Sequence, residues 1–180
     1  MNFPTKEKIF VTQPTLLTND FEKRVRDFSQ KWLQGNSYLQ LIRRDFLVNS
    51  GIRFLNICSQ DMIFTMCEIC CAKNYLVVPN VFYYRRQRSD LQSQEELDTP
   101  QTLQRYVSVL KQGVNYLDEF LNRQEFFAKR ADLKYCLFDT LFTEILEKLD
   151  NIYQKMPAHE LTALLRQAFD TDKAFNTFLF

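Results

Sequence analysis

The chain has 180 residues, with 23 Lys and Arg against 22 Asp and Glu, so its formal net charge is +1. A charge this close to neutral argues against a general nucleic-acid binder, which presents a strongly basic surface to phosphates. Three residues are glycine, whereas average usage gives about a dozen, and Rossmann or phosphate-loop domains need glycine where the backbone approaches phosphate. The composition predicts a helix-rich globular chain without such a domain.

The first part of the chain, residues 1–98, is expected to be a small mixed part of helices and short strands. After an irregular stretch over 1–17, Asp20 belongs to a Thr-Asn-Asp sequence that can cap a helix. The apolar residues that follow share one helical face as far as Gly35, where the helix is expected to end: Phe21, Val25, Phe28 and Trp32.

The rest of this mixed part alternates between helix and strand patterns. A helix is expected from Tyr38 to about Asn49, a short strand at 52–55 and a second helix over Asp61 to Lys73. Aromatic and β-branched residues predict short strands or an extended arm at 75–78 and 81–84, and the polar residues 85–99 predict an exposed loop.

The second part, residues 99–180, is expected to be an antiparallel helical bundle. Thr99-Pro100 is a helix-start sequence, and apolar residues then recur at spacings of four and three: Leu103, Val107, Leu110, Val114, Leu117 and Leu121. A long helix is expected from Phe126 to about Tyr153, another begins at Pro157, and Asp172 to Phe180 predicts a short last helix. The predicted fold class is therefore an α-rich α+β chain, with its internal boundary near residue 98.

Four short sequences between residues 37 and 89 occur in an order that is typical of one protein family. They are Ser37-Tyr38-Leu39-Gln40-Leu41-Ile42-Arg43-Arg44-Asp45-Phe46-Leu47, then Gly51-Ile52-Arg53-Phe54, then Gln60-Asp61-Met62-Ile63-Phe64, and then Ala72-Lys73 followed by Val78-Pro79 and Tyr83-Tyr84-Arg85-Arg86. This order resembles the acceptor-side, C-terminal half of bacterial family 2 glycosyltransferases. The resemblance covers under a third of the chain directly, and the flanking helices would correspond to the family's variable C-terminal region.

The chain departs from the family pattern in three ways. The family's Trp-Asn-Lys-Leu is here Tyr38-Leu39-Gln40-Leu41, and the Glu of its Glu-Asp pair is Gln60. The half that carries the nucleotide-binding sheet and the metal-chelating Asp-x-Asp is missing from these residues. The resemblance thus implies a fragment of a larger enzyme or a stand-alone piece without a donor site. No cofactor is expected in this chain, and a divalent cation (Mn²⁺ or Mg²⁺) is implied for a complete enzyme.

Asp61 matches the residue that resembles the family's catalytic base. In an inverting sugar transfer, a carboxylate takes the proton from the acceptor hydroxyl as its oxygen attacks the anomeric carbon. The alternative is structural: Asp61 would cap the predicted helix over 61–73, where its charge also suits the helix dipole.

Arg85, Arg86 and Arg88 form a basic cluster after the aromatic run. The resemblance suggests a clamp on the donor diphosphate, since guanidinium groups bind phosphates in two-pronged geometry. The alternative is a solvated loop, as charged loop residues commonly are.

Two further patterns point to metals but have simpler explanations. Cys67, Cys70 and Cys71 lack a second Cys-x-x-Cys partner for zinc, so their helical spacing favours a place in the core. Asp170-Thr171-Asp172 matches Asp-x-Asp by letter but follows a helical pattern rather than a strand, and is interpreted as a turn. No metal site is therefore expected.

The leading hypothesis is part of a nucleotide-sugar-dependent inverting glycosyltransferase that is inactive alone, with nucleotide sugar and glycan acceptor as partners of the complete enzyme. The alternative is a non-catalytic helical module that binds a protein or a second copy of itself through the 99–180 helices.

The N-terminal sequence has acids and no apolar segment, so no secretory signal is expected. The odd count of five cysteines favours a cytoplasmic location, and no apolar run predicts a transmembrane segment.

Overall fold

The structure is a computed structural model, and it describes residues 12–16, 19–30, 36–79, 105–154, 157–160 and 162–163. The main elements in chain order are β1 (Thr15–Leu16), α1 (Phe21–Ser29), the 3₁₀ helix η1 (Ser37–Leu39), α2 (Arg44–Ser50), α3 (Gln60–Cys71), β2 (Leu76–Val77), the π-helical turn η2 (Val109–Gly113), α5 (Val114–Asn122), α6 (Glu125–Lys129) and α7 (Ala131–Tyr153). The fold is α-rich α+β, as predicted.

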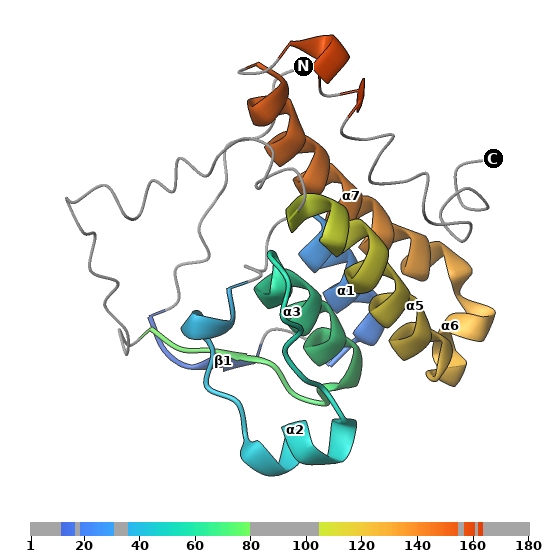
Figure 1. The fold of residues 1–180 in the computed structure, drawn as a ribbon. Coiled ribbons are helices and arrows are strands. Elements are labelled where there is room, and N and C mark those ends of the chain that lie inside the picture. Colours follow the sequence, from blue (N-terminus) through green and yellow to red (C-terminus); the bar gives the residue numbers. More distant parts are fainter. Residues whose placement is uncertain are drawn as a thin grey trace.

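Helix α3 lies at the centre of the helical packing. Residues 62–70 are all buried, because α1, α5 and α7 pack around the helix (Figure 1). A helix that is apolar nearly all round is stable where other elements cover every side. The predicted helix over 61–73 is thus confirmed, with bounds shifted to Gln60 and Cys71.

Helices from both predicted parts contribute to one hydrophobic core. Val25 and Phe28 of α1 meet α3 and the buried face of α5 and α7, whose members include Leu117, Leu137 and Ile145. The repeating face predicted between Val107 and Leu121 is buried as expected, with Leu110 partly covered. The proposed boundary near residue 98 lies outside the described residues.

A small antiparallel sheet joins two segments that are far apart in the sequence. β1 pairs with β2, with Thr15 opposite Val77 and Leu16 opposite Leu76. The strand predicted at 75–78 is confirmed in shortened form, but its partner falls in the stretch that was predicted to be irregular. A strand of two residues is too short to show an alternating pattern, so the sequence carries no signal for it.

Two other predictions were wrong in detail. Residues 52–55 were predicted to form a strand but have no regular structure; Ile52 is buried, and the ring of Phe54 stacks on that of Phe64 with their centroids 4.0 Å apart. The helix expected from Tyr38 to Asn49 is instead η1 followed by α2, which ends at Gly51 in the left-handed conformation.

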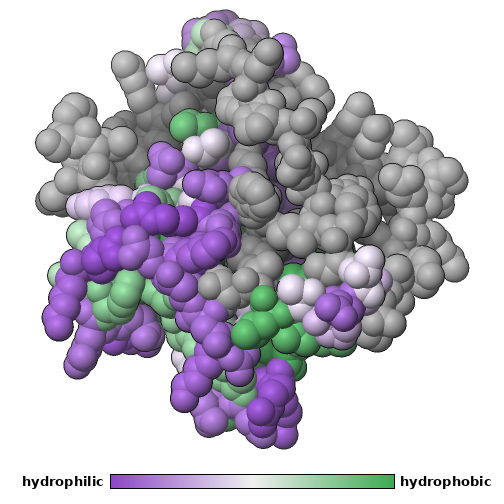
Figure 2. Space-filling view, turned by 180° about the vertical axis from the view of Figure 1, so that it is seen from behind, coloured by the Kyte–Doolittle hydropathy of each residue, from purple (hydrophilic) through white to green (hydrophobic). Residues whose placement is uncertain are grey.

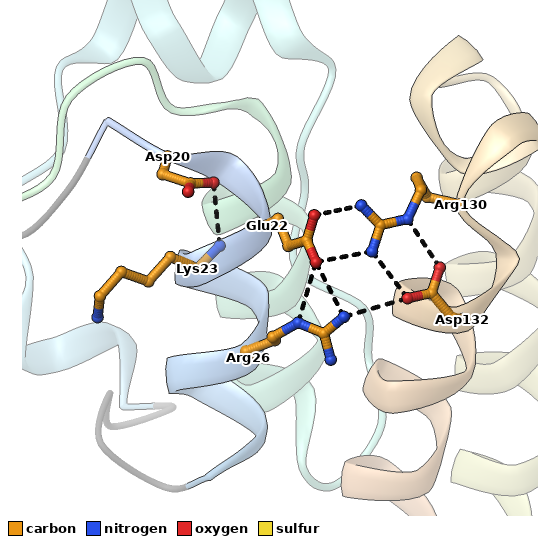
Figure 3. Close-up of polar contacts among 6 residues, drawn as sticks. All are labelled: Asp20, Glu22, Lys23, Arg26, Arg130 and Asp132. Atoms are coloured by element: carbon orange, nitrogen blue, oxygen red, sulfur yellow. Dashed lines mark hydrogen bonds and ion pairs between the residues drawn. The ribbon is translucent and has the colours of Figure 1, made fainter.

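The long helix expected from Phe126 to Tyr153 is broken at Arg130, and the side chain of Arg130 belongs to an ion-pair network (Figure 3). Arg130 donates to Glu22 of α1 and to Asp132 in the first turn of α7, and Arg26 of α1 also contacts both acids. The hydrogen bonds from Arg130 and Arg26 lower the pKa of Glu22 to about 2. The network therefore fastens α1 to the junction of α6 and α7.

Candidate functional site

Asp61 lies in the first turn of α3, on a rigid part of the molecule. The helix begins after Ser59, whose backbone is left-handed (φ 55°) and whose carbonyl oxygen accepts from the Met62 amide at 3.1 Å. Ser59 thus occupies the cap position, and the alternative that Asp61 caps the helix was wrong in that detail. The positive end of the helix dipole still favours a carboxylate at Asp61.

The carboxylate of Asp61 is held from one side by η1. The hydroxyl of Ser37 donates a hydrogen bond to Oδ1 of Asp61, and both side chains are partly buried. One turn further along α3, the Gln40 amide donates to Oγ1 of Thr65 at 3.2 Å. Because residues 61 and 65 lie on one face of the helix, these two bonds pin η1 along the first two turns of α3.

The surface next to this pair includes exposed apolar residues. Tyr38 and Leu39 of η1 are exposed, and so is Leu41 just beyond it. A fixed, partly buried carboxylate can accept a proton from a hydroxyl group that comes within hydrogen-bond distance. The described residues therefore provide one acid in a defined orientation beside an apolar surface.

The other predicted binding residues cannot be placed relative to Asp61. Arg85, Arg86 and Arg88 lie outside the described residues, so the proposed diphosphate clamp stays a prediction. Asp170, Thr171 and Asp172 also lie outside them.

The cysteines of α3 are placed as expected for core thiols. Cys67 and Cys70 are buried, and burial is the main factor that raises the pKa of both thiols. Cys71 is partly buried, and the Gln124 amide contacts its sulfur at 4.0 Å. Within the described part of the chain, no group of three or more His, Cys, Asp or Glu side chains is placed to hold a metal ion.

Sequence reasoning missed two buried charged residues, Arg24 of α1 and Glu68 of α3. Burial raises the pKa of Glu68 to about 7 and lowers that of Arg24. A signal for Glu68 was present, because it is the one charged residue in an otherwise uncharged run from Met62 to Ala72. Arg24 gives no such signal, since it lies among other charged residues.

No family model, curated protein or solved structure matches this chain. Among the described residues, no helix combines the length and the apolar character needed to cross a membrane.

Proposed function

We propose that this chain forms the acceptor side of an inverting transfer from a nucleotide sugar, with Asp61 as the general base. The observation that carries the proposal is the hydrogen bond from Ser37 to Asp61. It joins two of the sequences in which the chain resembles family 2 glycosyltransferases, those over 37–47 and 60–64. Residues 24 positions apart are thereby brought to one place, as a shared site requires.

In the proposed reaction, the acceptor hydroxyl approaches the Asp61 carboxylate. Its O–H bond breaks, the proton passes to Asp61, and the oxygen forms a bond to the anomeric carbon of the donor sugar. The bond from that carbon to the diphosphate breaks at the same time, so the configuration of the carbon inverts. Ser37 orients the base by occupying Oδ1.

The donor and its divalent cation are assigned to a half of the enzyme that these 180 residues do not contain. The described residues hold no carboxylate cluster that fits the cation. A clamp of Arg85, Arg86 and Arg88 on the diphosphate remains part of the proposal.

A glycan array tests the acceptor side directly. We expect the wild-type chain to bind at least one glycan class, and Asp61→Asn to weaken that binding about tenfold, because a hydrogen bond to a charged group contributes roughly 1.5–3 kcal/mol. Asp45→Asn is the matched control, since Asp45 is an exposed acid in the first turn of α2. Absence of glycan binding, or equal binding by wild type and Asp61→Asn, contradicts the proposal.

Calorimetry with UDP- and GDP-sugars and Mn²⁺ tests the donor side. We expect weak binding or none, because the chain lacks the nucleotide-binding half of the family it resembles. Tight, metal-dependent binding of a nucleotide sugar by these 180 residues would overturn the assignment of the donor site to another half.

A second candidate function is a helical interaction module, and two exposed apolar residues on α7 favour it. Tyr135 is 70% exposed and Leu146 is 63% exposed, and their separation of 11 residues is about three helical turns, which puts them on one face. The face of the molecule opposite to that in Figure 1 also carries hydrophobic side chains beside strongly hydrophilic ones (Figure 2). If α7 mediates self-association, light scattering will detect an oligomer of the wild type. The double variant Tyr135→Ser, Leu146→Ser should dissociate this oligomer. A monomeric wild type contradicts the interaction-module function.

A further inference from the structure

Exposed apolar side chains gather between η1 and the stretch that follows α2. Leu39 is 53% exposed, Leu41 81%, Val48 68% and Phe54 51%, and all four lie within 16 consecutive residues. Single exposed apolar residues are normal on a protein surface, whereas several close together mark a place of interaction. The segment from Leu39 to Phe54 therefore has the composition of a binding surface.

α2 turns one side to the core and the other to solvent. Phe46 and Leu47 pack against the hydrophobic core, whereas Arg44 and Val48, which lie one helical turn apart on the same face, are both exposed. The helix lies at one end of the molecule, apart from the helices around α3 (Figure 1). At that end, hydrophobic side chains lie beside strongly hydrophilic ones (Figure 2).

The charges in this segment are mostly positive. It contains three arginines and one acid, Asp45, although the whole chain has a net charge of only +1. Arg43 and Arg44 are exposed, and neither forms an ion pair with another described residue. Guanidinium groups bind phosphates in two-pronged geometry. The charge next to the exposed apolar residues thus complements a partner that carries phosphate groups.

We propose that Leu41, Arg43, Arg44 and Val48 form a docking surface for an anionic lipid bilayer. The two arginines pair with lipid phosphates, and the two apolar side chains enter the boundary between the headgroups and the acyl chains. This docking surface does not depend on the proposed function, because it uses neither Asp61 nor Ser37.

A bilayer fits this surface better than a folded acidic protein does. Leu39 belongs to η1, Leu41 follows it, Val48 belongs to α2, and Phe54 lies in the irregular stretch after that helix. The apolar residues therefore lack the regular spacing along one helix or strand by which protein partners commonly recognise each other. Lipids are fluid and rearrange around separate side chains, so a bilayer needs no matching shape.

Co-sedimentation of the 180-residue chain with lipid vesicles tests the charge contribution. We expect the wild type to bind vesicles of phosphatidylcholine with phosphatidylserine about tenfold or more tighter than vesicles of phosphatidylcholine alone. Arg43→Gln with Arg44→Gln should weaken binding to the anionic vesicles by roughly fivefold for each arginine removed. The matched control is Arg123→Gln with Lys129→Gln, which removes the same charge from exposed positions in another part of the molecule and should bind like the wild type.

A second pair of variants tests the apolar contribution. Leu41→Ser with Val48→Ser should weaken binding to the anionic vesicles about tenfold, because both side chains lose the apolar surface that enters the bilayer. Tyr135→Ser with Leu146→Ser removes two exposed apolar side chains of α7 and should leave binding unchanged. Because all four positions are exposed, the circular dichroism spectra of both variants should match that of the wild type.

Four outcomes would overturn the proposal. The first two are absence of binding to the anionic vesicles and equal binding to the anionic and neutral vesicles. The third is a loss of binding in either control as large as in its test variant. The fourth is binding to poly-glutamate without binding to vesicles, which would assign the surface to an acidic protein.

Discussion

Gly113 shows how a single residue sets the distance between two helices. It lies in η2, and a Cβ atom at this position would be 2.5 Å from Cδ1 of Ile63 and 3.0 Å from Cδ1 of Ile57. Contacts this short force neighbouring atoms to move. Glycine therefore allows the turn before α5 to pack directly on α3.

We expect Gly113→Ala to lower the free energy of unfolding by about 1–3 kcal/mol, as overpacking of a core does. Ile63→Val removes the nearest atom, Cδ1, so it should recover part of this loss in the Gly113→Ala chain, although alone it costs about 1 kcal/mol. Urea denaturation of the two single variants and the double variant provides the measurement. Strictly additive effects would show that the contact does not set the spacing.

The chain has three glycines, and the two that the structure describes each have a structural role. Gly51 ends α2 with φ 67°, a conformation that other residues adopt at a cost. Gly113 permits close helix packing. Both described glycines thus serve helix ends and helix packing, and neither supports a phosphate-binding loop.

At the scale of elements, long periodic segments were predictable and local exceptions were not. The cap at Asp20 and the buried face of α1 were predicted, and Oδ1 of Asp20 indeed accepts from the Lys23 amide at 3.2 Å. The break at Arg130 was not predicted, and the contact of Arg130 with Glu22, which is 108 positions away, has no signal in the local sequence. β1 escaped prediction for a similar reason, since its strand character comes from pairing with β2.

The network between α1 and the α6–α7 junction predicts acid sensitivity. The pKa values of Glu22 and Asp132 are lowered to about 2, mainly by hydrogen bonds from Arg130. Their contribution to stability is therefore present above their ordinary pKa values of 4.5 and 3.8 and is lost as the pH falls toward 2.

We expect the urea midpoint of the wild type to fall between pH 5 and pH 2, and Arg130→Gln to make that fall shallower. Arg123→Gln is the matched control, because Arg123 pairs with Glu119 on the exposed surface of α5. Equal acid dependence in Arg130→Gln and the wild type would mean that the network does not couple the helices energetically.

At the scale of the whole molecule, the shared core predicts cooperative behaviour. Leu137 of α7 is fully buried in a cluster that also contains Val25 of α1 and Ile63 of α3. Leu137→Ala should cost about 2–5 kcal/mol and should lower amide protection in α1 and α3 as well as in α7. Loss of protection confined to α5, α6 and α7 would show that the two parts are independent folding units.

The candidate site could be predicted in part. The sequence pointed to Asp61 through the resemblance to family 2 glycosyltransferases, and the apolar pattern after it predicted the helix that presents it. Its contact with Ser37 could not be predicted, since it depends on the path of the chain between η1 and α3. Glu68 was visible as a charge in an apolar run, but its burial follows from tertiary packing alone.

Mapping of amide chemical shifts during titration with a glycan that the array identifies tests whether Asp61 and Ser37 belong to a glycan acceptor site. We expect the shifts to cluster at residues 36–41 and 59–65, and we expect Asp61→Asn to remove them while Asp45→Asn does not. Shifts that are absent, that lie along the exposed face of α7, or that persist in Asp61→Asn would contradict it.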